Sequence, residues 1–258
     1  MQKTDFEFEV LVGLEWDDYE SEQFLPNNPN ERAILKVIRN TKDGLVFING
    51  NRTGRGNTIN LLEGAKGEYI AFCDGDDYWT DPLKLQKQVN FLDAHQDYVG
   101  CYGGCMHVDE NKKILLESRF AEYKSPTSEK LITGQGAMIT NSVMFRNVID
   151  KYPMAFKHVP SGDTILYHLL GFHGHGKYIP DIGFGAYRIH CRGVWSGINV
   201  VRRMENTFQT FSAIKENLSA HFGTNHHLVQ HVNNTVFYNV QVYIMNSLKD
   251  YKWGLYFK

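Results

Sequence analysis

Three carboxylates follow a buried strand and stand close enough in sequence to share a cation. The segment Gly67-Glu-Tyr-Ile-Ala-Phe-Cys-Asp-Gly-Asp-Asp-Tyr-Trp leads from apolar residues into Asp74, Asp76 and Asp77. In open α/β sheets, ligands bind at the carboxyl ends of the strands. Crowded carboxylates repel one another unless a cation lies between them, and hard divalent ions take oxygen ligands. The pattern favours a divalent metal site over the alternative, a solvated acidic turn that caps the next helix.

Alternating strands and helices are expected to position this acidic segment. Apolar runs predict strands over residues 6–12, 45–48, 68–73 and 98–108, and a strand or a helix over 33–39. Helices are expected over 58–65 and, because Pro82 opens the pattern, over 82–94. Polar and Gly-rich stretches predict loops over 14–30 and 50–56, and a hairpin turn at 111–113. This order predicts an α/β sandwich with a mainly parallel sheet.

From residue 200 onward the pattern changes to two amphipathic helices joined by Gly223-Thr-Asn. One apolar stripe consists of Met204, Phe208, Phe211, Ile214, Leu218 and Phe222. The other consists of Leu228, Val232, Val236, Val240, Ile244 and Leu248. We expect the helices to pack on each other or on the main domain. The alternative, docking on a membrane surface, is disfavoured because their polar faces carry Asn, Gln and His instead of dense Lys and Arg. The predicted organisation is a domain over 1–199 and a helical extension over 200–258.

Composition excludes several classes of protein. The net charge is -2, which gives no support to a nucleic-acid binder that works by neutralising phosphates. No apolar run approaches the ~20 residues that a spanning helix needs, and the first residues lack the apolar stretch of a signal peptide. The 4 cysteines are therefore expected to be reduced thiols, including the Cys101–Cys105 pair, in a cytoplasmic protein.

Taken in order, several segments resemble glycosyltransferase family 2, whose members have the GT-A fold and use nucleotide sugars. The acidic segment is similar to the family's metal-binding signature. Asn57 and the helix after it resemble the segment that helps to form the nucleotide pocket, and Asn141-Ser-Val-Met-Phe-Arg resembles the acceptor-side strand. Ser161-Gly-Asp-Thr resembles the turn that carries the catalytic carboxylate, and Tyr187-Arg-Ile-His-Cys-Arg-Gly-Val-Trp-Ser resembles the closing motif. The resemblance covers roughly residues 5–200 and implies a GT-A-like, Rossmann-type fold.

The resemblance implies a role for particular residues. Asp76, with Asp74 beside it, would hold Mn²⁺ or Mg²⁺ against the departing diphosphate, and Asp74 is the alternative partner of the ribose hydroxyls. Asp163 would be the general base of an inverting transfer. The remaining assignments have structural alternatives: His190 as a further metal ligand or diphosphate contact, and Asn57, Arg55 and Trp195 as contacts of the nucleotide sugar. We expect Arg188 to hold a loop and not the diphosphate.

The sequence departs from the family at its N-terminal end. Family members begin with a central strand and a helix, whereas this chain starts just before the family's second strand. We therefore expect a further segment of ~25–35 residues upstream, and a strand at 7–12 that lies at a sheet edge or beside an unfilled slot. Leu14 and Glu15 stand where the family has an acidic pair that contacts the base, and Arg55 lies one place from the usual arginine. The pocket for the nucleobase is accordingly the part that the resemblance defines least.

These observations predict a metal-dependent inverting glycosyltransferase that is cytoplasmic or peripheral at the inner face of the membrane. Its expected partners are a nucleotide-sugar donor, a UDP-sugar in the first instance, and a saccharide or lipid-linked acceptor, with no nucleic acid. A homodimer through the C-terminal helices is a further expectation. The alternatives are an inactive remnant or sugar-binding paralogue, favoured by the altered base pocket, and a nucleotidyltransferase, which would need a Gly-rich triphosphate loop.

Overall fold

A computed structural model describes residues 1–25, 31–116, 124–189 and 200–256. The strands are β1 (Phe8–Leu14), β2 (Ala33–Arg39), β3 (Val46–Ile48), β4 (Asn51–Thr53), β5 (Tyr69–Ala71), β6 (Tyr78–Trp79), β7 (Tyr98–Tyr102), β8 (Cys105–Val108), β9 (Ile114–Leu116), β10 (Met144–Arg146), β11 (His175–Tyr178) and β12 (Gly185–Arg188). The helices are α1 (Arg55–Gly64), α2 (Lys84–Ala94), α3 (Ser128–Ile132), α4 (Met154–His158), α5 (Gly162–Gly171), α6 (Val200–Phe222) and α7 (His227–Tyr256). Short 3-10 turns lie at Ser21–Phe24, Lys42–Gly44 and Thr140–Ser142. The α/β fold expected from the sequence is confirmed.

The strands form mixed sheets, which differs from the mainly parallel sheet that we expected. One sheet has the order β11-β7-β10-β5, and a second has the order β6-β12-β8-β9. The pairs β1–β2, β7–β11 and β8–β12 are parallel. However, β10 runs antiparallel to both of its neighbours, and the hairpin pairs β3–β4 and β8–β9 are antiparallel as well. Hairpins force antiparallel pairing because the chain reverses within a few residues.

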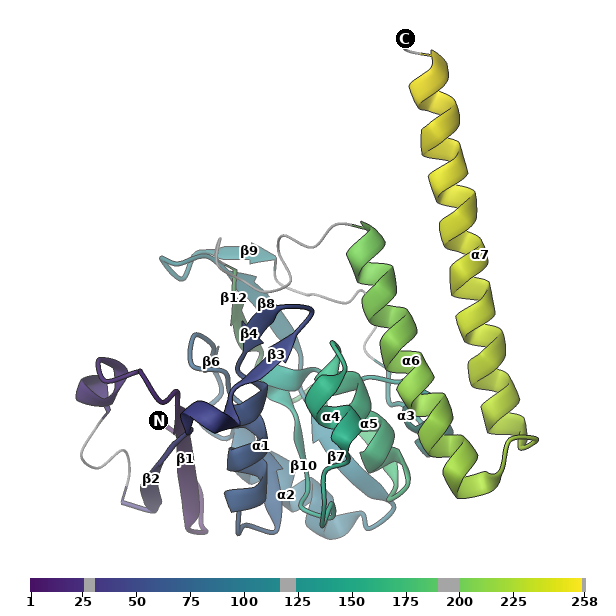
Figure 1. The fold of residues 1–258 in the computed structure, drawn as a ribbon. Coiled ribbons are helices and arrows are strands. Elements are labelled where there is room, and N and C mark those ends of the chain that lie inside the picture. The colour runs from purple at the N-terminus through teal and green to yellow at the C-terminus, as the bar shows by residue number, and fades with distance from the viewer. Residues whose placement is uncertain (26–30, 117–123, 190–199, 257–258) are drawn as a thin grey trace.

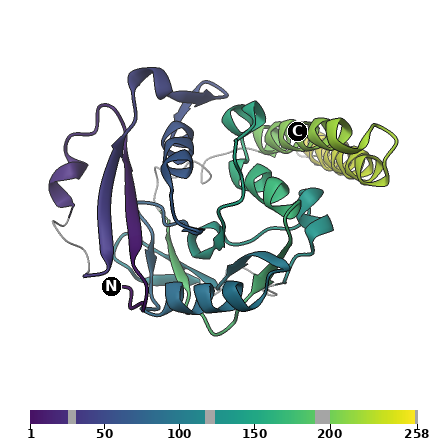
Figure 2. The same ribbon diagram turned by 90° about the horizontal axis from the view of Figure 1, so that it is seen from below.

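The strand pair β1–β2 lies at one side of the molecule and the helix pair α6–α7 at the other (Figure 1). The β1 strand is paired with β2 from Phe8 to Leu14, and no other strand in the described ranges pairs with it. This agrees with the expectation that the strand at 7–12 lies at an edge. Helix α1 packs beside β1 (Figure 2). The side chain of Leu61 in α1 lies against Gly13 of β1.

Two local predictions, one of a loop and one of a strand, differ from the structure. Residues 50–56 were expected to be a loop, but they contain β4 and the start of α1. The reversal before β4 is the Asn49-Gly50 turn, in which both residues have positive φ, 52° and 81°. Asn and Gly adopt this conformation readily, so this dipeptide is a strong hairpin signal. The expected strand over 98–108 is divided into β7 and β8 at Gly103-Gly104, where a Cβ on Gly104 would lie 2.4 Å from the ring of Phe184.

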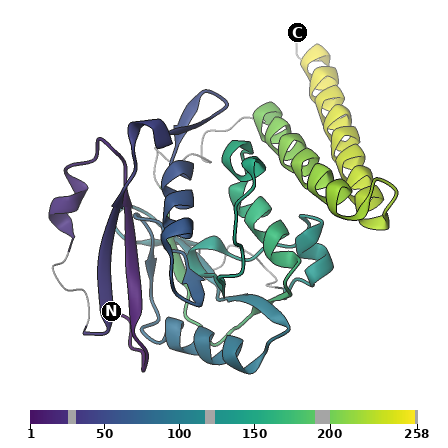
Figure 3. The same cartoon turned by 60° about the horizontal axis from the view of Figure 1, so that its bottom comes forward.

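The C-terminal helices pack on the main body chiefly through the C-terminal half of α6 and the N-terminal part of α7, and Asn206 near the start of α6 accepts a hydrogen bond from Asn49. Ile214 and Leu218 of α6 and Leu228, Val229 and Val232 of α7 belong to the principal hydrophobic core. The N-terminal part of the α6 stripe stays open, since Phe208 is 53% exposed. Ile244 and Leu248, predicted on the second stripe, lie outside the side chains that the structure describes. Gly223, with a φ of 86°, ends α6 and lets the chain reverse into α7 (Figure 3).

Candidate active site

The acidic segment forms a tight turn at the carboxyl end of β5. The backbone N–H of Asp77 donates to the carbonyl of Asp74 at 3.0 Å, which closes the turn before β6. Asp74 and Asp76 are exposed, whereas Asp77 is half-buried. The apolar strand ends at Ala71 because it has reached the rim of the sheet, so the carboxylates emerge at the edge where α/β folds bind ligands.

Arg188, at the end of β12, holds this turn in place. Its backbone N–H donates to Oδ1 of Asp77 at 2.9 Å, and its Nε donates to the carbonyl of Asp76 at 2.9 Å. A third bond runs from Nη1 to the carbonyl of Glu110 at 2.9 Å. These bonds confirm the expectation that Arg188 holds a loop. The motif that contains Arg188 thereby fixes the backbone from which Asp76 projects.

Burial and neighbouring carboxylates disfavour the charged forms of Asp74 and Asp77 in this turn. Although open to solvent, Asp74 has protein around it on several sides, and this loss of hydration raises the pKa of its carboxyl. The charges of Asp76 and Asp163 raise that pKa further. Burial, followed by the charges of Asp74 and Asp76, raises the pKa of Asp77 to about 6. The Oδ2 atom of Asp77 is buried without a hydrogen-bond partner in the described structure. A cation in this turn would relieve each of these costs.

Asp163 comes from a distant part of the chain and lies within electrostatic reach of the acidic turn. It is an exposed residue in the first turn of α5, and its Oδ1 accepts a hydrogen bond from the backbone N–H of Thr164 at 2.8 Å. Its charge raises the pKa of Asp74 and also acts on Arg55. The tertiary structure thus brings Asp163 within electrostatic range of Asp74, the residue beside Asp76 in the acidic turn.

Arg55 connects the start of α1 to the segment that precedes Asp163. Its guanidinium donates to the backbone carbonyls of Phe156, Val159 and Pro160, and it packs over the ring of Phe156 at 5.2 Å. Gly162 is required for this arrangement, because a Cβ there would lie 2.2 Å from Cζ of Arg55. Burial lowers the pKa of the guanidinium, and the charge of Asp163 opposes that effect. The geometry therefore places Arg55 as a support of the α4–α5 connection.

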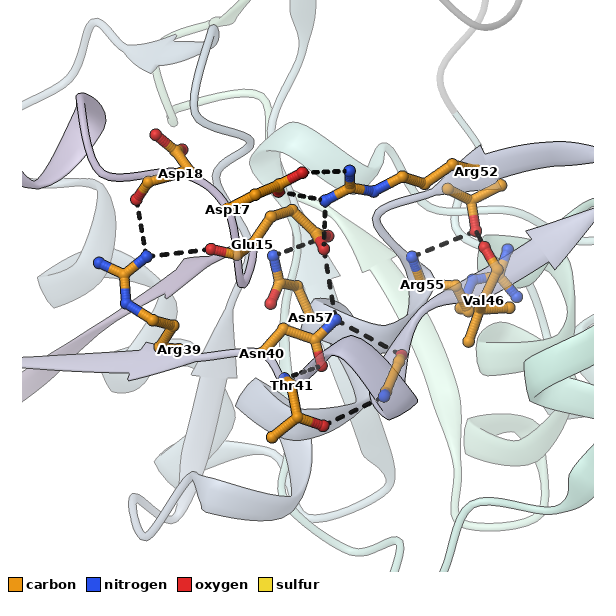
Figure 4. Close-up of polar contacts among 12 residues, drawn as sticks. Glu15, Asp17, Asp18, Arg39, Asn40, Thr41, Val46, Arg52, Arg55 and Asn57 are labelled. Atoms are coloured by element: carbon orange, nitrogen blue, oxygen red, sulfur yellow. Dashed lines mark hydrogen bonds and ion pairs between the residues drawn. The ribbon is translucent and has the colours of Figure 1, made fainter.

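Asn57 belongs to a polar network at the carboxyl ends of β1 and β2 (Figure 4). Its Nδ2 donates to Oε1 of Glu15 at 3.0 Å, and its Oδ1 is buried without a partner in the described structure. Glu15 also accepts from Nη2 of Arg52 at 3.1 Å and from Nδ2 of Asn40 at 3.4 Å. Arg52 in turn forms a bidentate pair with Asp17, with N···O distances of 2.8 and 2.7 Å.

The sequence alone did not predict that Asn40 and Arg52 belong to this network. Glu15 was predicted only as a position that differs from the family. Glu15 and Asn40 directly follow β1 and β2, where polar residues reach the ligand edge, and Asn40 also directly follows the apolar run 33–39 in the sequence. Leu14, the neighbour of Glu15, is buried and turns toward the core.

Two of the predicted site residues, His190 and Trp195, lie outside the described residues. Within the described ranges, no group of three or more His, Cys, Asp or Glu side chains is gathered as a ready-made metal site. The carboxylates nonetheless suit Mg²⁺ or Mn²⁺, because such ions are often held by one or two protein carboxylates while phosphate oxygens and waters complete the shell. The charges of Asp74 and Asp77, which burial and neighbouring carboxylates disfavour, point the same way.

Other eye-catching residues have structural roles. Cys101 and Cys105 are buried free thiols, as expected, and burial raises the pKa of Cys101 to about 12. In the His173-Gly-His segment, Nδ1 of His175 accepts a hydrogen bond from the backbone N–H of Ser128 at 2.8 Å. Among the described residues, no helix is both long enough and apolar enough to cross a membrane.

Comparison with known proteins agrees with this architecture. Residues 27–152 match the family described as glycosyl transferase family 2. The chain is 30% identical over 210 residues to Uncharacterized protein Mb1547 of Mycobacterium bovis and to Uncharacterized protein Rv1520 of Mycobacterium tuberculosis, a match that covers 78% of this chain and 56% of each relative. It is also 30% identical over 128 residues to Uncharacterized glycosyltransferase MJ1057 of Methanocaldococcus jannaschii, covering 49% of this chain and 44% of that protein. The chain thus spans about half the length of the curated relatives that it matches.

The matched segment contains the acidic turn, α1 with Asn57, and β10, which are three of the segments that carry the resemblance in the sequence. The turn with Asp163 and the closing motif from Tyr187 follow after the matched segment. The order of these motifs, the α/β architecture and the match lead to one conclusion: residues 27–152, about half of the chain, are a glycosyl transferase family 2 segment.

Proposed function

We propose that this protein transfers a sugar from a nucleoside-diphosphate sugar to a saccharide or lipid-linked acceptor, with inversion at the anomeric carbon and with Mn²⁺ or Mg²⁺ as cofactor. The observation that carries the proposal is the approach of Asp163 to the acidic turn, from a helix far along the chain. In this arrangement Asp163 would be the base for the acceptor hydroxyl, and the acidic turn beside it would hold the metal ion and the diphosphate of the donor.

The donor side of the proposal rests on Asp74 and Asp76. These carboxylates, with His190 as a further candidate, would hold the ion, which when bound supplies positive charge to the departing diphosphate. Arg188 keeps the turn in one conformation by bonding Asp77 and the carbonyl of Asp76. A preorganised turn loses little conformational freedom when ion and diphosphate bind.

The acceptor side rests on Asp163. A base in this position would take the proton of the acceptor hydroxyl as that oxygen attacks the anomeric carbon from the face opposite the diphosphate. The bond from Thr164 N–H to Oδ1 orients the carboxylate and leaves Oδ2 to receive the proton. A direct displacement of this kind inverts the anomeric configuration.

The nucleoside is proposed to lie near Asn57. The buried Oδ1 of Asn57 has no partner among the described residues, so it can accept a hydrogen bond from a donor nucleotide. Glu15 orients the Asn57 amide through Nδ2. Trp195 is proposed to stack on the donor. Arg55 is proposed to influence the nucleotide-sugar site indirectly, because it supports the α4–α5 connection that leads to Asp163. UDP is our first choice of nucleotide, and the site of action is proposed to be the cytoplasm or the inner face of the membrane.

Calorimetric titration with UDP and Mn²⁺ tests this proposal. The wild-type chain should bind UDP only when Mn²⁺ is present, and Asp76→Ala should abolish this binding while the fold survives. The matched control is Asp150→Ala, since Asp150 is an exposed aspartate outside the site. Unchanged affinity in Asp76→Ala would remove the metal assignment.

The alternative function, a non-catalytic sugar-binding paralogue, is favoured by the burial of Leu14 at the position where the family has an acidic residue. Such a protein should bind no nucleoside diphosphate, with or without Mn²⁺. A screen of nucleotide sugars for metal-dependent hydrolysis separates the two functions and also identifies the donor.

A further inference from the structure

The side chain of Asn141 is an amide that is buried without satisfying its hydrogen bonds. It is 5% exposed, and neither Nδ2 nor Oδ1 has a hydrogen-bond partner of normal geometry among the residues that the structure describes. Buried polar groups in native proteins are nearly always paired, because a group that has lost water and gained no partner destabilises the fold. A buried amide of this kind therefore indicates a role that packing alone does not explain.

Three elements of the candidate active site meet at this amide. Asn141 lies in the 3-10 turn that precedes β10, and Nε1 of Trp79 in β6 donates to its backbone carbonyl at 2.7 Å. In β12, which pairs with β6, a Cβ on Gly185 would lie only 2.9 Å from Oδ1 of Asn141. Glycine at position 185 thus leaves room for the amide, and Arg188 at the end of the same strand holds the acidic turn.

The amide lies beside Asp77, the aspartate of the acidic turn that is half-buried where Asp74 and Asp76 are exposed. Burial raises the pKa of Asp77, and the Asn141 amide opposes that rise as a hydrogen-bond donor close to the carboxylate. One oxygen of Asp77, Oδ1, accepts from the backbone N–H of Arg188, whereas Oδ2 is buried without a partner. An amide nitrogen that can donate and a carboxylate oxygen that can accept are complementary, so the two side chains can form one hydrogen-bonded pair.

The backbone that carries Asn141 is held firmly. Trp79 bonds the carbonyl of Asn141 itself, and Nε2 of Gln88 donates to the carbonyl of the next residue, Ser142, at 2.9 Å. The hydroxyl of Ser142 donates in turn to the carbonyl of Gly103 at 2.9 Å. The amide is therefore a fixed point against which the acidic turn can be aligned.

We propose that Asn141 is a positioning residue for the acidic turn, with Nδ2 as the donor that holds Oδ2 of Asp77 when the turn binds its ligand. Hydrogen bonds in such sites are often poorly aligned before the ligand binds and tighten when it does. With Arg188 on Oδ1 and Asn141 on Oδ2, both oxygens of Asp77 are occupied by the protein. Asp77 is then the anchor of the turn, and Asp74 and Asp76 are left to hold the ion. The inference rests on the proposed function for the identity of the ligand, and it adds which of the three carboxylates binds it.

Calorimetric titration with Mn²⁺ and UDP, on variants that change the pair, tests this role. Asn141→Leu should lower the affinity about tenfold, because one hydrogen bond to a charged group is lost. Asn141→Asp sets two carboxylates against each other and should lower the affinity further. Adding Asp77→Asn to Asn141→Asp restores one donor and one acceptor, so the affinity should return to within a few-fold of the wild-type value. The matched control is Asn206→Leu, which removes another amide that is 5% exposed and should leave the affinity unchanged.

The exchanged pair, Asp77→Asn/Asn141→Asp, also distinguishes an anchor from a ligand of the ion. It keeps the hydrogen bond but moves the charge from position 77 to position 141. If it loses as much affinity as Asp76→Ala, Asp77 is itself a ligand and the proposal is wrong. Wild-type affinity in Asn141→Leu would overturn the proposal as well.

Urea unfolding in the presence of a chelator examines the pair without any ligand, so it separates this inference from the proposed function. Asn141→Asp should unfold at a lower urea concentration than the wild type, and adding Asp77→Asn should recover most of that loss. No recovery would mean that the two side chains do not form a pair, against the proposal. Recovery in a protein that binds no UDP with Mn²⁺ would support the pair as the anchor of the turn and reject the proposed function.

Discussion

The acidic turn at residues 74–77 and the network around Glu15 both concentrate carboxylates at strand ends, yet they handle negative charge in opposite ways. In the network, Glu15 accepts from Arg52, Asn57 and Asn40, and Asp17 forms a bidentate pair with Arg52. In the turn, by contrast, neighbouring carboxylates raise the pKa of Asp74 and of Asp77.

The difference distinguishes a region that is complete by itself from one suited to a ligand. Charges that are paired within the chain stabilise it and orient a neighbour, here the amide of Asn57. Charges that repel one another lower stability until a cation arrives, and folds retain such clusters chiefly where ligands bind. The comparison thus supports our proposals that the turn binds the metal and that the network orients a nucleotide contact.

The largest effect is expected for Asp163→Asn. Because the amide cannot take a proton, we expect transfer to fall by about 10²–10⁴-fold while donor binding remains. The measurement is the initial rate with the donor identified in the hydrolysis screen, with Asp150→Asn as control. Transfer within a few-fold of the wild-type rate would assign the base to another residue.

Arg55→Lys separates support of the site from contact with the donor. Lysine cannot reproduce the three bonds to the carbonyls of Phe156, Val159 and Pro160. If Arg55 positions Asp163, kcat should fall about tenfold with little change in KM for the donor, as for loss of an interaction that matters in the transition state. A raised KM with unchanged kcat would show instead that Arg55 contacts the nucleotide sugar.

Stability measurements on one variant from the acidic turn and one from the network around Glu15 test the contrast between the two regions. In Glu15→Gln, the part-buried amides of Asn57 and Asn40 lose a charged acceptor, so we expect the free energy of unfolding to fall by about 1 kcal/mol. In Asp74→Asn, a carboxylate whose charged form is disfavoured by burial and by neighbouring carboxylates is removed, so stability without metal should stay equal or rise slightly. Urea unfolding in the presence of a chelator gives both values. Greater destabilisation by Asp74→Asn would refute the contrast between the two regions.

The last prediction concerns Lys84, a fully buried residue whose Nζ donates to Gln88 and lies over the ring of Trp79. Burial lowers the pKa of Lys84 to about 7. Between about pH 7 and pH 10 the unfolded chain therefore binds one more proton than the folded chain, and stability should rise with pH by at most about 1.4 kcal/mol per pH unit.

Lys84→Met should remove this slope, whatever its effect on absolute stability. Urea unfolding of both proteins across that range, plotted as their difference in free energy of unfolding against pH, measures the slope. A difference that does not vary with pH would mean that Lys84 keeps its charge in the folded protein.

Much of the local structure was predictable from the sequence. Apolar runs located β1, β3 and β5, and Pro82 together with the apolar period located α2, because these elements follow from patterns within about ten residues. Ala33–Arg39 was left open between strand and helix, since a short apolar run suits both, and pairing with β1 decides for a strand. The Asn49-Gly50 pair is a recognisable hairpin signal, but the prediction was of a loop over 50–56. The break between β7 and β8 at Gly103-Gly104 depends instead on contact with Ile182 and Phe184, which are distant in the sequence.

The candidate site shows the same division. The sequence by itself determined which residue types stand at strand ends, and with the family resemblance it selected Asp74, Asp76 and Asp163 for one site. Only the tertiary structure decided that Glu15 is held by Asn57 and Arg52, 42 and 37 positions away, and that Arg55 supports the segment before Asp163 instead of standing free. The physical reason is range: periodicity and turn chemistry act between near neighbours, whereas compensation of a charge depends on which distant side chains the fold brings within hydrogen-bonding distance.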